Sequence, residues 1–540
     1  MLTRAQRIQD KAYARRWWIL TILCFGLLVI VLDNSILNVA LPTIQKDLDA
    51  SSSDLQWIVD SYTLVFAGLL LTAGSLGDRF GRRGALQVGF ALFGIGSIAS
   101  AMAMTSGQLI GTRAFMGIGG ALIMPATLSI ITNVFPPEER AKAIGAWAGV
   151  AGLGGALGPL TGGFLVEHFY WGSVFLVNIP IVIIGVLAGF FLIPTSKDPT
   201  APRLDPIGAG LSIVGLAVLL FAIIEAPGKG WGSAHTLVPG AIGIALLVAF
   251  AWWEKTTDHP MLDVSFFSKP RFSAAAGAIT LVFFAMFGSL FLLTQYFQFV
   301  LGYSPLETGV RMLPFAAAMM VTAPLSARIA DRVGTKITVA VGLGLVTVGL
   351  LSMTGLQADT PYLNIFWRLM LMSAGMGLTM APATESVMGS LPLFKAGVGS
   401  AVNDTTRQVG GALGVAVIGS VLATTYGNKI GEFLSGLTDS AVQFTGPQVA
   451  AAKNSIGAVQ NGIVPGLRSN GLDSLADQIS SVANDAFVSA VHRGVIVAAL
   501  ATGLGVFVVL AYLPARARAA DVELQDLEFV DEHAADHVID

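Results

Sequence analysis

The sequence predicts an all-α polytopic membrane protein with fourteen transmembrane helices, and three observations support this. First, 54% of the 540 residues are hydrophobic and only 12% are charged, whereas soluble domains carry about 25% charged residues. Second, apolar segments of roughly 20 residues, the length needed to cross a bilayer, recur along almost the whole chain. Third, the basic residues alternate between these segments as expected for fourteen spans.

The candidate spans follow one another with mostly short connections. They lie near residues 17–40, 55–76, 84–104, 107–132, 141–166, 172–194, 206–225, 237–255, 273–300, 306–328, 337–357, 361–390, 397–424 and 490–513. The first span is too long for the hydrophobic region of a signal peptide and no small-residue cleavage site follows it, so we expect it to remain. The single cysteine, Cys24, lies inside this span, which excludes a disulfide framework.

The basic residues orient the chain in the membrane. With the N-terminus in the cytoplasm, 21 of the 31 basic residues fall on inner loops and tails, 6 fall outside and 4 lie within spans. Such an excess on the cytoplasmic side is what the positive-inside rule requires, and omitting one span would remove the alternation. We therefore expect a multi-pass protein of the cell inner membrane with both termini in the cytoplasm.

The spans divide into two halves with an extra pair between them. Residues 17–194 are expected to form an N-terminal six-helix bundle and residues 273–513 a C-terminal one, with two extra transmembrane helices in residues 206–255. The cytoplasmic tails are residues 1–16 and residues 514–540, the second of which is acidic.

A large outer loop, residues 425–489, interrupts the C-terminal half. It is polar, but the segments QVAAAKNSIGAVQNGI (448–463) and LDSLADQISSVANDAFVSAVH (472–492) have helical apolar spacing. We therefore expect short surface helices in and around this loop.

An internal repeat relates the two halves. Span two is followed by GSLGDRFGRR (74–83) and span ten by SARIADRVGTK (326–336), so the same Asp-Arg-x-Gly frame occurs twice, about 250 residues apart, on tight inner loops. Structural repeats of this kind are the usual architecture of secondary transporters.

The first of these loops has residues suited to gating rather than to substrate binding. Glycine supplies the tight turn, and Asp78 can interact with the backbone amides that open the next helix. Arg140, at the start of span five, is a further candidate partner for Asp78. The loop residues to which we assign a gating role are Gly74, Gly77, Asp78, Arg79, Gly81 and Arg82, with Asp331 as the counterpart of Asp78 in the second copy.

Several motifs resemble those of a known family. GSLGDRFGRR is similar to the loop signature of the major facilitator superfamily, and LDNSILNVALP (32–42) to the first-span signature of its fourteen-spanner drug:proton antiporters. LIGTRAFMGIGGA (109–121) resembles the fourth-span arginine motif, although Met116 stands where that motif usually has Gln. GVAGLGGALGPLTGG (149–163) resembles the fifth-span antiporter motif, which the family associates with export rather than uptake. FLVNIP (175–180), LGYSPLETG (301–309) and SAVNDTTRQVGGALG (400–414) also look like family blocks.

Charged residues inside the spans mark the candidate transport site. Counting about 1.5 Å per helical residue places Asp33, Asp60 and Arg113 at one level in the outer part of the N-terminal half. The same count places Glu385, Asp404 and Arg407 in the inner third of the C-terminal half.

Two interpretations of these charges remain open. Each acid could simply pair with a nearby arginine and hold helices together, which for Asp404 and Arg407, at positions i and i+3, is as reasonable as a functional role. Intramembrane ionisable groups usually mark a transport pathway, and for this reason we favour a functional role for Asp33.

Span five combines close-packing glycines with a proline. Gly154, Gly158 and Gly162 form small-x-x-x-small steps that allow close helix contact, and Pro159 permits a kink. A tight helix interface would explain a single such step. Seven glycines and a proline in fifteen residues favour a sliding gate.

The resemblance implies a proton-coupled exporter of amphipathic, cationic or aromatic compounds that works by alternating access. Burial favours the protonated form of a carboxyl group, whereas a nearby guanidinium favours the charged form. If Arg113 approaches Asp33 in one conformation and leaves it in the other, inward proton flow would drive export. An exporter of a lipid or of a self-made secondary metabolite on the same fold is the alternative.

Other classes of protein lack their motifs in this chain. No H-E-x-x-H or G-x-S-x-G motif of an enzyme occurs, and no G-x-x-x-x-G-K-[ST] motif of an ATP-driven pump. We therefore expect no enzyme activity, no metal and no cofactor, with the proton gradient as the energy source. The expected partners are a small amphipathic substrate, protons and the lipid bilayer, with no nucleic acid, and the expected state is a monomer.

Overall fold

The described chain is a bundle of long helices. The computed structural model describes residues 13–50, 52–197, 205–258, 260–436 and 444–515. The predicted tails lie almost wholly outside these residues. Of the described segments, thirteen are helices long and apolar enough to cross a membrane. The fourteenth predicted span is α14 (Tyr362–Met388), a helix of 27 residues that packs against α12 and α13 but contains both Arg368 and Glu385. The all-helical prediction is confirmed, and these helices together are consistent with the predicted fourteen spans.

The helices fall close to their predicted positions. The N-terminal half contains α2 (Arg16–Asp47), α3 (Ser52–Phe80), α4 (Arg82–Ala101), α5 (Ser106–Val134), α6 (Pro137–His168), the short α7 (Ser173–Leu176) and α8 (Asn178–Leu192). The extra pair is α9 (Pro206–Lys229) and α10 (Ala234–Thr256). The C-terminal half contains α11 (Pro270–Gln295), α12 (Pro305–Val333), α13 (Thr335–Ser352), α14, α15 (Ala396–Gly436) and α19 (Asp473–Tyr512).

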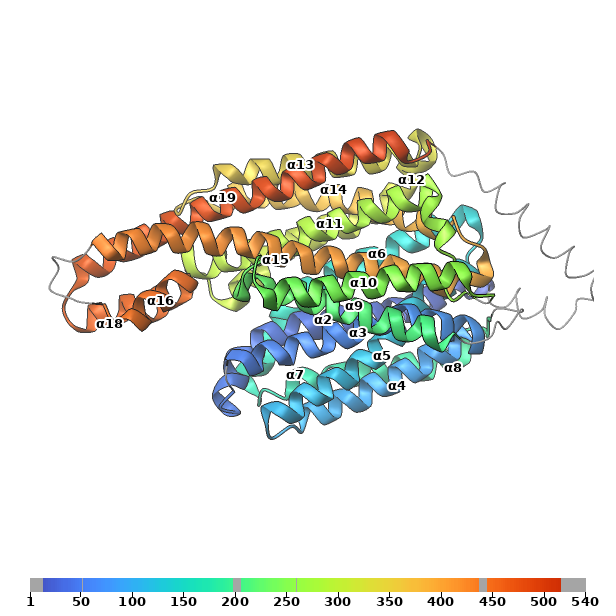
Figure 1. The fold of residues 1–540 in the computed structure, drawn as a ribbon, viewed down its shortest axis with the longest axis horizontal. Coiled ribbons are helices and arrows are strands. Elements are labelled where there is room, and N and C mark those ends of the chain that lie inside the picture. The colour runs from blue at the N-terminus through green and yellow to red at the C-terminus, as the bar shows by residue number, and fades with distance from the viewer. Residues whose placement is uncertain (1–12, 51, 198–204, 259, 437–443, 516–540) are drawn as a thin grey trace, which may run out of the picture.

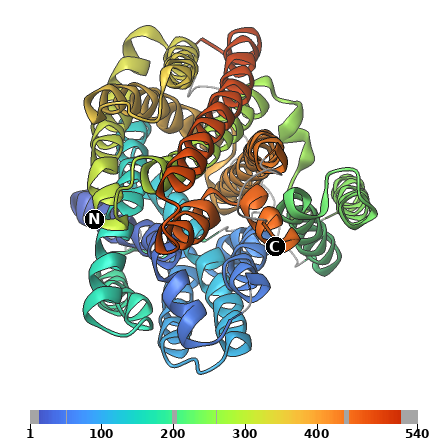
Figure 2. The same cartoon turned by 90° about the vertical axis from the view of Figure 1, so that its left-hand side faces the viewer.

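The two halves lie side by side with their helices roughly parallel, and α9 and α10 run along one edge of the bundle (Figures 1 and 2). Helix α6 packs along α12, and α3 and α5 pack against α15, so these helices form the interface between the halves. Helix α9 contacts α3 of one half and α15 of the other. We call the end of the bundle with the Asp-Arg-x-Gly loops the inner end, because the charge pattern predicts that it faces the cytoplasm.

The outer loop is more helical than predicted. The segment 448–463 does form short helices, namely α16 (Gly446–Asn454), α17 (Ile456–Ala458) and the turns that lead to α18 (Val464–Ser469). The segment 472–492, in contrast, is not a separate surface helix. It is the first part of α19, which is continuous to Tyr512, and α15 likewise extends past residue 424 to Gly436.

The physical reason is that the apolar stripe of α19 continues beyond the membrane span without a helix breaker. Ile479, Ala483 and Phe487 are buried, and no Gly or Pro occurs between Asp473 and Gly494. The Phe487 ring packs edge-on against Tyr426 of α15 at 6.1 Å. The two long helices therefore extend together beyond the bundle and hold α16 and α18 against them (Figure 1).

We predict that Gly414 is needed for α15 to pack against α11. A Cβ atom at this position would lie 2.2 Å from the backbone oxygen of Phe284. Gly414→Val should therefore destabilise the purified protein by about 1–3 kcal/mol, seen as a lower midpoint of thermal unfolding in detergent. Gly419→Ala is the matched control on the same helix, because its Cβ would be 3.5 Å from the nearest atom, in the Phe291 ring. Equal midpoints for the two variants would contradict this packing.

Candidate functional site

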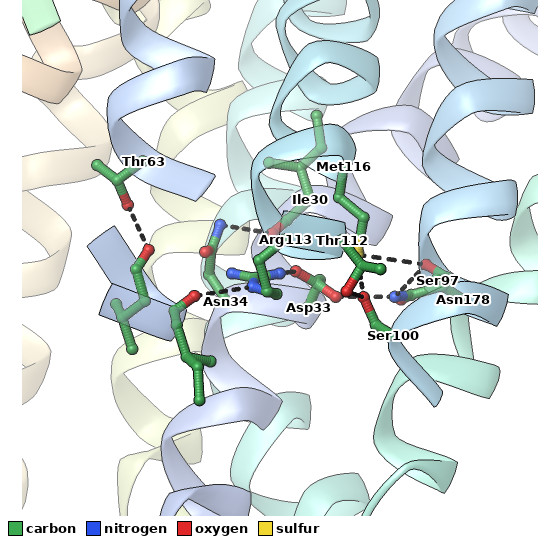
Figure 3. A network of polar contacts seen from close by, with 12 residues as sticks. Ile30, Asp33, Asn34, Thr63, Ser97, Ser100, Thr112, Arg113, Met116 and Asn178 are labelled. Carbon is green, nitrogen blue, oxygen red and sulfur yellow. Dashed lines mark hydrogen bonds and ion pairs between the residues drawn. The ribbon is translucent and has the colours of Figure 1, made fainter. Parts of the chain in front are cut away.

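Asp33 lies in the middle of a buried polar network in the N-terminal half. Its side chain on α2 is 2% exposed, and Arg113 of α5 is 0% exposed. Arg113 Nη1 lies 2.5 Å from Asp33 Oδ2, and Asn178 Nδ2, at the start of α8, donates to Asp33 Oδ1 at 2.9 Å. Figure 3 shows Asp33 between the two partners. The carboxylate therefore joins three helices of the same half.

Arg113 extends the network to a fourth helix. Its Nε donates to the backbone oxygen of Ile58 on α3 at 3.2 Å. Its guanidinium lies 4.4 Å from the centre of the Tyr62 ring, one turn further along α3. Both a carboxylate and an aromatic face thus stabilise this buried cation.

A row of small polar side chains continues the network on the other side of Asp33. Asn178 Nδ2 also approaches Ser97 Oγ at 3.3 Å, and Ser100 Oγ donates to Thr112 Oγ1 at 2.9 Å. Met116, which stands where the family motif usually has Gln, is fully buried and its sulfur accepts from Ser100 Oγ at 3.4 Å. Met116 thus contacts the serine row (Figure 3).

Asp60 shares the level of Asp33 but lies on another side of α3. It is half-buried and stands between Ile58 and Tyr62, the two residues of α3 that contact Arg113. Each of those lies two residues away, and two residues turn an α-helix by about 200°. Asp60 thus lies on a different side of α3 from the Tyr62 ring that contacts Arg113.

The second predicted pair, Asp404 and Arg407, belongs to a buried polar cluster. We call these two residues, together with Trp147, Thr384, Ser400 and Asn403, the inner cluster. The side chains of Asp404 and Arg407 are buried, and Arg407 Nη1 lies 3.7 Å from Asp404 Oδ1. Arg407 Nη2 also donates to Thr384 Oγ1 at 3.2 Å. The guanidinium lies 4.8 Å from the centre of the Trp147 ring on α6. Because α6 belongs to the N-terminal half, this cluster reaches across the interface between the halves.

Several buried polar atoms of this cluster have no hydrogen-bond partner among the described residues. They are Ser400 Oγ, Asn403 Oδ1, Asp404 Oδ2, Arg407 Nε and Trp147 Nε1. Buried polar atoms in native proteins are normally hydrogen-bonded to protein, water or ligand. The inner cluster therefore has spare hydrogen-bonding capacity for water or for a polar substrate group.

Glu385 lies apart from this pair. It is half-buried on α14 and within electrostatic reach of Arg271, Arg140 and Asp331, all at the inner end of the bundle. Its environment is that of the inner surface rather than that of Asp404.

The first Asp-Arg-x-Gly loop connects the two halves at the inner end. Asp78 Oδ1 accepts from the backbone amide of Gly397 at 2.9 Å and Oδ2 from that of Val398 at 3.1 Å. Arg82 Nε donates to Asp78 Oδ1 at 2.7 Å, and Arg82 Nη2 donates to the backbone oxygens of Leu393 and Phe394. We call Asp78, Arg82, Gly397 and Val398 the inner latch.

The inner latch corrects one prediction. The amides that bind Asp78 open α15 of the other half, not the helix that follows the loop, because Asp78 reaches over the interface to the unsatisfied N–H groups of α15. Its charged partner is Arg82, four residues further along the chain. Arg140, the other candidate partner, lies near Glu385.

The loop glycines serve the latch in different ways. A Cβ at Gly74 would lie 2.5 Å from the backbone oxygen of Gly397, so the two halves touch backbone to backbone here. Gly81 has φ +114°, which favours glycine. At Gly77 a Cβ would meet nothing closer than 3.5 Å, and Arg79 lies over the ring of Phe80 at 5.3 Å. Gly77 is therefore peripheral to the latch.

The second copy of the loop does not repeat the latch. Asp331 is exposed at the end of α12, whereas Asp78 is 5% exposed. Gly334 does repeat the turn, with φ +93°. The sequence repeat is thus preserved in the turn and lost in the contact between the halves.

The predicted glycine face of α6 packs within its own half. A Cβ at Gly154, Gly158 or Gly162 would approach Val31, Ser35 or Ile36 of α2 at 3.0, 2.2 and 3.3 Å. The face of α6 that contacts α12 of the other half contains different glycines, Gly145 and Gly149, whose Cβ atoms would lie 2.7 and 3.2 Å from α12. The predicted glycines therefore join α6 to the helix of Asp33, and the interface between the halves uses another face.

Pro159 explains one contact of that face. A proline has no N–H, so the backbone oxygen of Gly155, four residues earlier, lacks its helical donor. Ser35 Oγ of α2 donates to this oxygen at 3.0 Å. Gly158 leaves the space for Ser35, since a Cβ there would be 2.3 Å from Ser35 Cβ. Ser35, two residues after Asp33, thus links the helix of Asp33 to the turn of α6 that contains Pro159.

The sequence interpretation missed four contributors. Asn178 belongs to the quoted FLVNIP segment, and a lone Asn in an apolar span was the available signal. Ser35 and Tyr62 lie next to predicted residues, and Trp147 lies within the predicted span 141–166. Their roles depend on contacts between helices, which one sequence does not reveal.

Comparison with known proteins decides the family. The family description "Major Facilitator Superfamily" matches residues 23–415. The chain belongs to the major facilitator superfamily. It is therefore a multi-pass membrane transporter rather than an enzyme.

Several relatives within this superfamily are named as proteins of drug resistance or efflux. The chain is 36% identical to the multidrug resistance protein Stp of Mycobacterium tuberculosis over 74% of each chain. It is 34% identical to the tetracenomycin C resistance and export protein of Streptomyces glaucescens over 88% of this chain and 87% of the relative. It is 35% identical to the multidrug efflux pump LfrA of Mycolicibacterium smegmatis over 82% of this chain and 86% of the relative.

Solved structures share the fold. A bacterial homologue of the human lysosomal transporter Spinster, in an inward-facing and unoccupied conformation, superposes with a TM-score of 0.55 at 19% identity. That match covers 92% of this chain and 98% of the other. The human organic anion transporter MFSD10 superposes with a TM-score of 0.56 at 14% identity, covering 86% of this chain and 98% of the other.

We predict that the inner latch holds the inner end closed. Asp78→Ala removes the acceptor of two amides and of a guanidinium, and hydrogen bonds to charged groups contribute about 1.5–3 kcal/mol each. A cysteine introduced as Ser400→Cys in a Cys24→Ser background should then react with a maleimide at least tenfold faster. Asp331→Ala is the matched control in the second copy of the loop and should leave this rate unchanged. Equal rates for the two variants would refute the latch.

We predict that Ser35 replaces the helical donor that Pro159 lacks. Ser35→Ala should destabilise the protein by about 1 kcal/mol, because the backbone oxygen of Gly155 loses its donor. In a Pro159→Ala background the helix supplies its own N–H, so Ser35→Ala should cost much less. The measurement is a double-mutant cycle of thermal unfolding midpoints, and an equal cost in both backgrounds would contradict this role.

Proposed function

We propose that the protein is a proton-coupled exporter of amphipathic, cationic or aromatic compounds that works by alternating access in the cell inner membrane, with both termini in the cytoplasm. The observation that carries this proposal is the Asp33–Arg113 pair, which is fully buried and joins α2, α3, α5 and α8. The resistance and efflux proteins among the relatives support the direction of transport.

Asp33 is the proton carrier in this mechanism. In the present conformation its carboxylate is neutralised by Arg113 and held by Asn178. If Arg113 moves away, the isolated carboxylate in an apolar surrounding takes up a proton, because burial favours its neutral form. The proton enters from the outside and leaves to the cytoplasm as Arg113 returns. No cofactor is required, since the proton gradient supplies the energy.

The inner latch gives the mechanism its two states. With Asp78 bound to the amides of Gly397 and Val398, the halves are joined at the inner end. Breaking these hydrogen bonds allows the halves to separate there and to admit substrate from the cytoplasm. Alternating access needs such a contact, present in one state and absent in the other.

The inner cluster suits the proposed substrate class. The ring of Trp147 already faces the Arg407 guanidinium, and Asp404 has a carboxylate oxygen without a partner among the described residues. An aromatic face and a carboxylate together stabilise an organic cation. Asp404 and Arg407 are therefore the proposed substrate contacts, with Asp60 and Glu385 as accessory charges at the two ends of the path.

A second candidate function is export of a self-made secondary metabolite or a lipid. The tetracenomycin C resistance and export protein, matched over 88% of this chain, supports the metabolite version. The same charged sites and the same two states would serve it. The two candidates differ in the substrate that competes for the site, not in the mechanism.

We predict that Asp33 couples export to the proton gradient. In inverted membrane vesicles with an acidic lumen, the wild-type monomer should drive uptake of ethidium, and nigericin should abolish it. Asp33→Asn should reduce the proton-driven flux at least tenfold, because the amide cannot carry a proton. Asp477→Asn, an exposed acid of the outer helices, is the control and should retain the flux.

Two results would count against this function. Wild-type flux that persists after the gradient is collapsed would exclude proton coupling. Ethidium flux in Asp33→Asn that remains fully sensitive to nigericin would exclude Asp33 as the carrier. Competition by unlabelled compounds separates the candidates: block by a range of unrelated cations indicates a drug exporter, and block by a single polyketide-like compound indicates a metabolite exporter.

A further inference from the structure

A groove lies at the outer end of the C-terminal half, away from the predicted transport site. Its volume is about 520 Å³, and it opens where the loop between α9 and α10 meets α15 and α19. Val417 and Val421 supply its apolar wall, Ser420 and Thr424 supply hydroxyl groups, and Trp231 and Arg493 complete the lining. None of these residues takes part in the Asp33 network, the inner cluster or the inner latch.

The groove lies at the outer boundary of the bilayer. Residues 417–424 of α15 end one predicted span, and Arg493 stands near the start of another on α19. Trp231 follows Lys229, where α9 ends, and its Nε1 donates to Ser420 Oγ at 2.7 Å. Tryptophans gather at the membrane interface, with the ring in the apolar layer and the N–H bonded to a polar group. Three separate segments thus place the groove at the level of the lipid headgroups.

Arg493 is a cation without an ion-pair partner among the residues that the structure describes. Its side chain is exposed, and the ion pairs of the described chain do not include it. The groove also contains no carboxylate among its lining residues. An arginine at the membrane surface is attracted to anionic lipid headgroups. A lipid phosphate is the anion present at this depth.

We propose that this groove binds one anionic phospholipid of the outer leaflet. The phosphate pairs with Arg493, the hydroxyls of Ser420 and Thr424 bond to the headgroup, and one acyl chain lies against Val417 and Val421. A headgroup with an added ammonium, as in phosphatidylethanolamine, finds no carboxylate in the groove, so phosphatidylglycerol is preferred. The lipid fills the space between the extra helices and the C-terminal half, where α9 also packs against α15.

The test uses the full chain in nanodiscs of phosphatidylglycerol and phosphatidylcholine. After release from the nanodiscs, native mass spectrometry should show one retained phosphatidylglycerol per protein. Arg493→Gln should lower its occupancy about fivefold, the effect of one basic residue near a membrane surface. Val421→Trp should do the same without a change of charge, because the indole fills the groove. Arg468→Gln, which removes an outer cation paired with Asp477, is the control and should leave occupancy unchanged.

The thermal unfolding midpoint of each variant in lipid-free detergent shows whether it still folds, so occupancy is compared only among variants with a wild-type midpoint. Equal retention by wild type and Arg493→Gln overturns the proposal. Equal retention of phosphatidylcholine and phosphatidylglycerol by the wild type overturns it as well. A dimer that Val421→Trp dissociates would show that a second copy of the chain occupies the groove, and it too overturns the proposal.

Discussion

The burial of one carboxylate and one guanidinium inside an apolar bundle is the constraint on which the N-terminal half depends. Breaking a buried ion pair by removing one partner costs about 3–5 kcal/mol, because the other charge is left uncompensated. Arg113 therefore has to remain beside Asp33 for as long as both side chains are charged and shielded from water. Its further contacts with the backbone of Ile58 and the ring of Tyr62 fix α3 in place. The position of four helices follows from the need to satisfy two charges.

The repeat shows how one sequence frame can have two outcomes. Asp78 binds the N-terminus of α15, which opens with Ala396, Gly397 and Val398 and so offers free amides. The corresponding helix of the first half, α6, opens with Pro137, Glu138 and Glu139. A proline has no amide to offer, and the two glutamates repel a carboxylate such as Asp331. The two halves are related in fold, but of the two corresponding aspartates only Asp78 forms the inner latch.

Much of the fold was predictable because membrane spans depend on length and composition. A helix lies at each of the fourteen predicted spans, and α14 was recognised despite Arg368 and Glu385 because most of its other residues are apolar. The outer helices were only partly predicted. A criterion based on membrane spans predicts that α15 and α19 end at the bilayer. Their apolar stripes nevertheless continue beyond it, where the two helices pack on each other and α15 packs on α16.

The charged residues of the site were predictable as types and levels, but not as partners. Depth counting placed Asp33 and Arg113 together because both are rare in apolar spans. It could not tell on which side of α3 Asp60 lies, since that depends on the rotation of α3 about its axis. Nor could it find Asn178, Ser35 or Trp147, whose roles arise only when α8, α2 and α6 pack against other helices. The amides that receive Asp78 lie about 320 residues further along the chain, so local sequence pointed to the wrong helix.

The helix α2 connects these features into one mechanical unit. Asp33 faces Arg113, and two residues later Ser35 is bonded to the oxygen that Pro159 leaves open in α6. On its other side, Pro159 lies against Gly309 of α12, where an added Cβ would be 3.1 Å from the proline ring. Any shift of α2 that accompanies a change of charge at Asp33 therefore acts on the weakest point of α6, the turn that lacks a helical hydrogen bond. Since α6 and α12 pack along the interface between the halves, a local change at the buried carboxylate has a short, contiguous route to that interface.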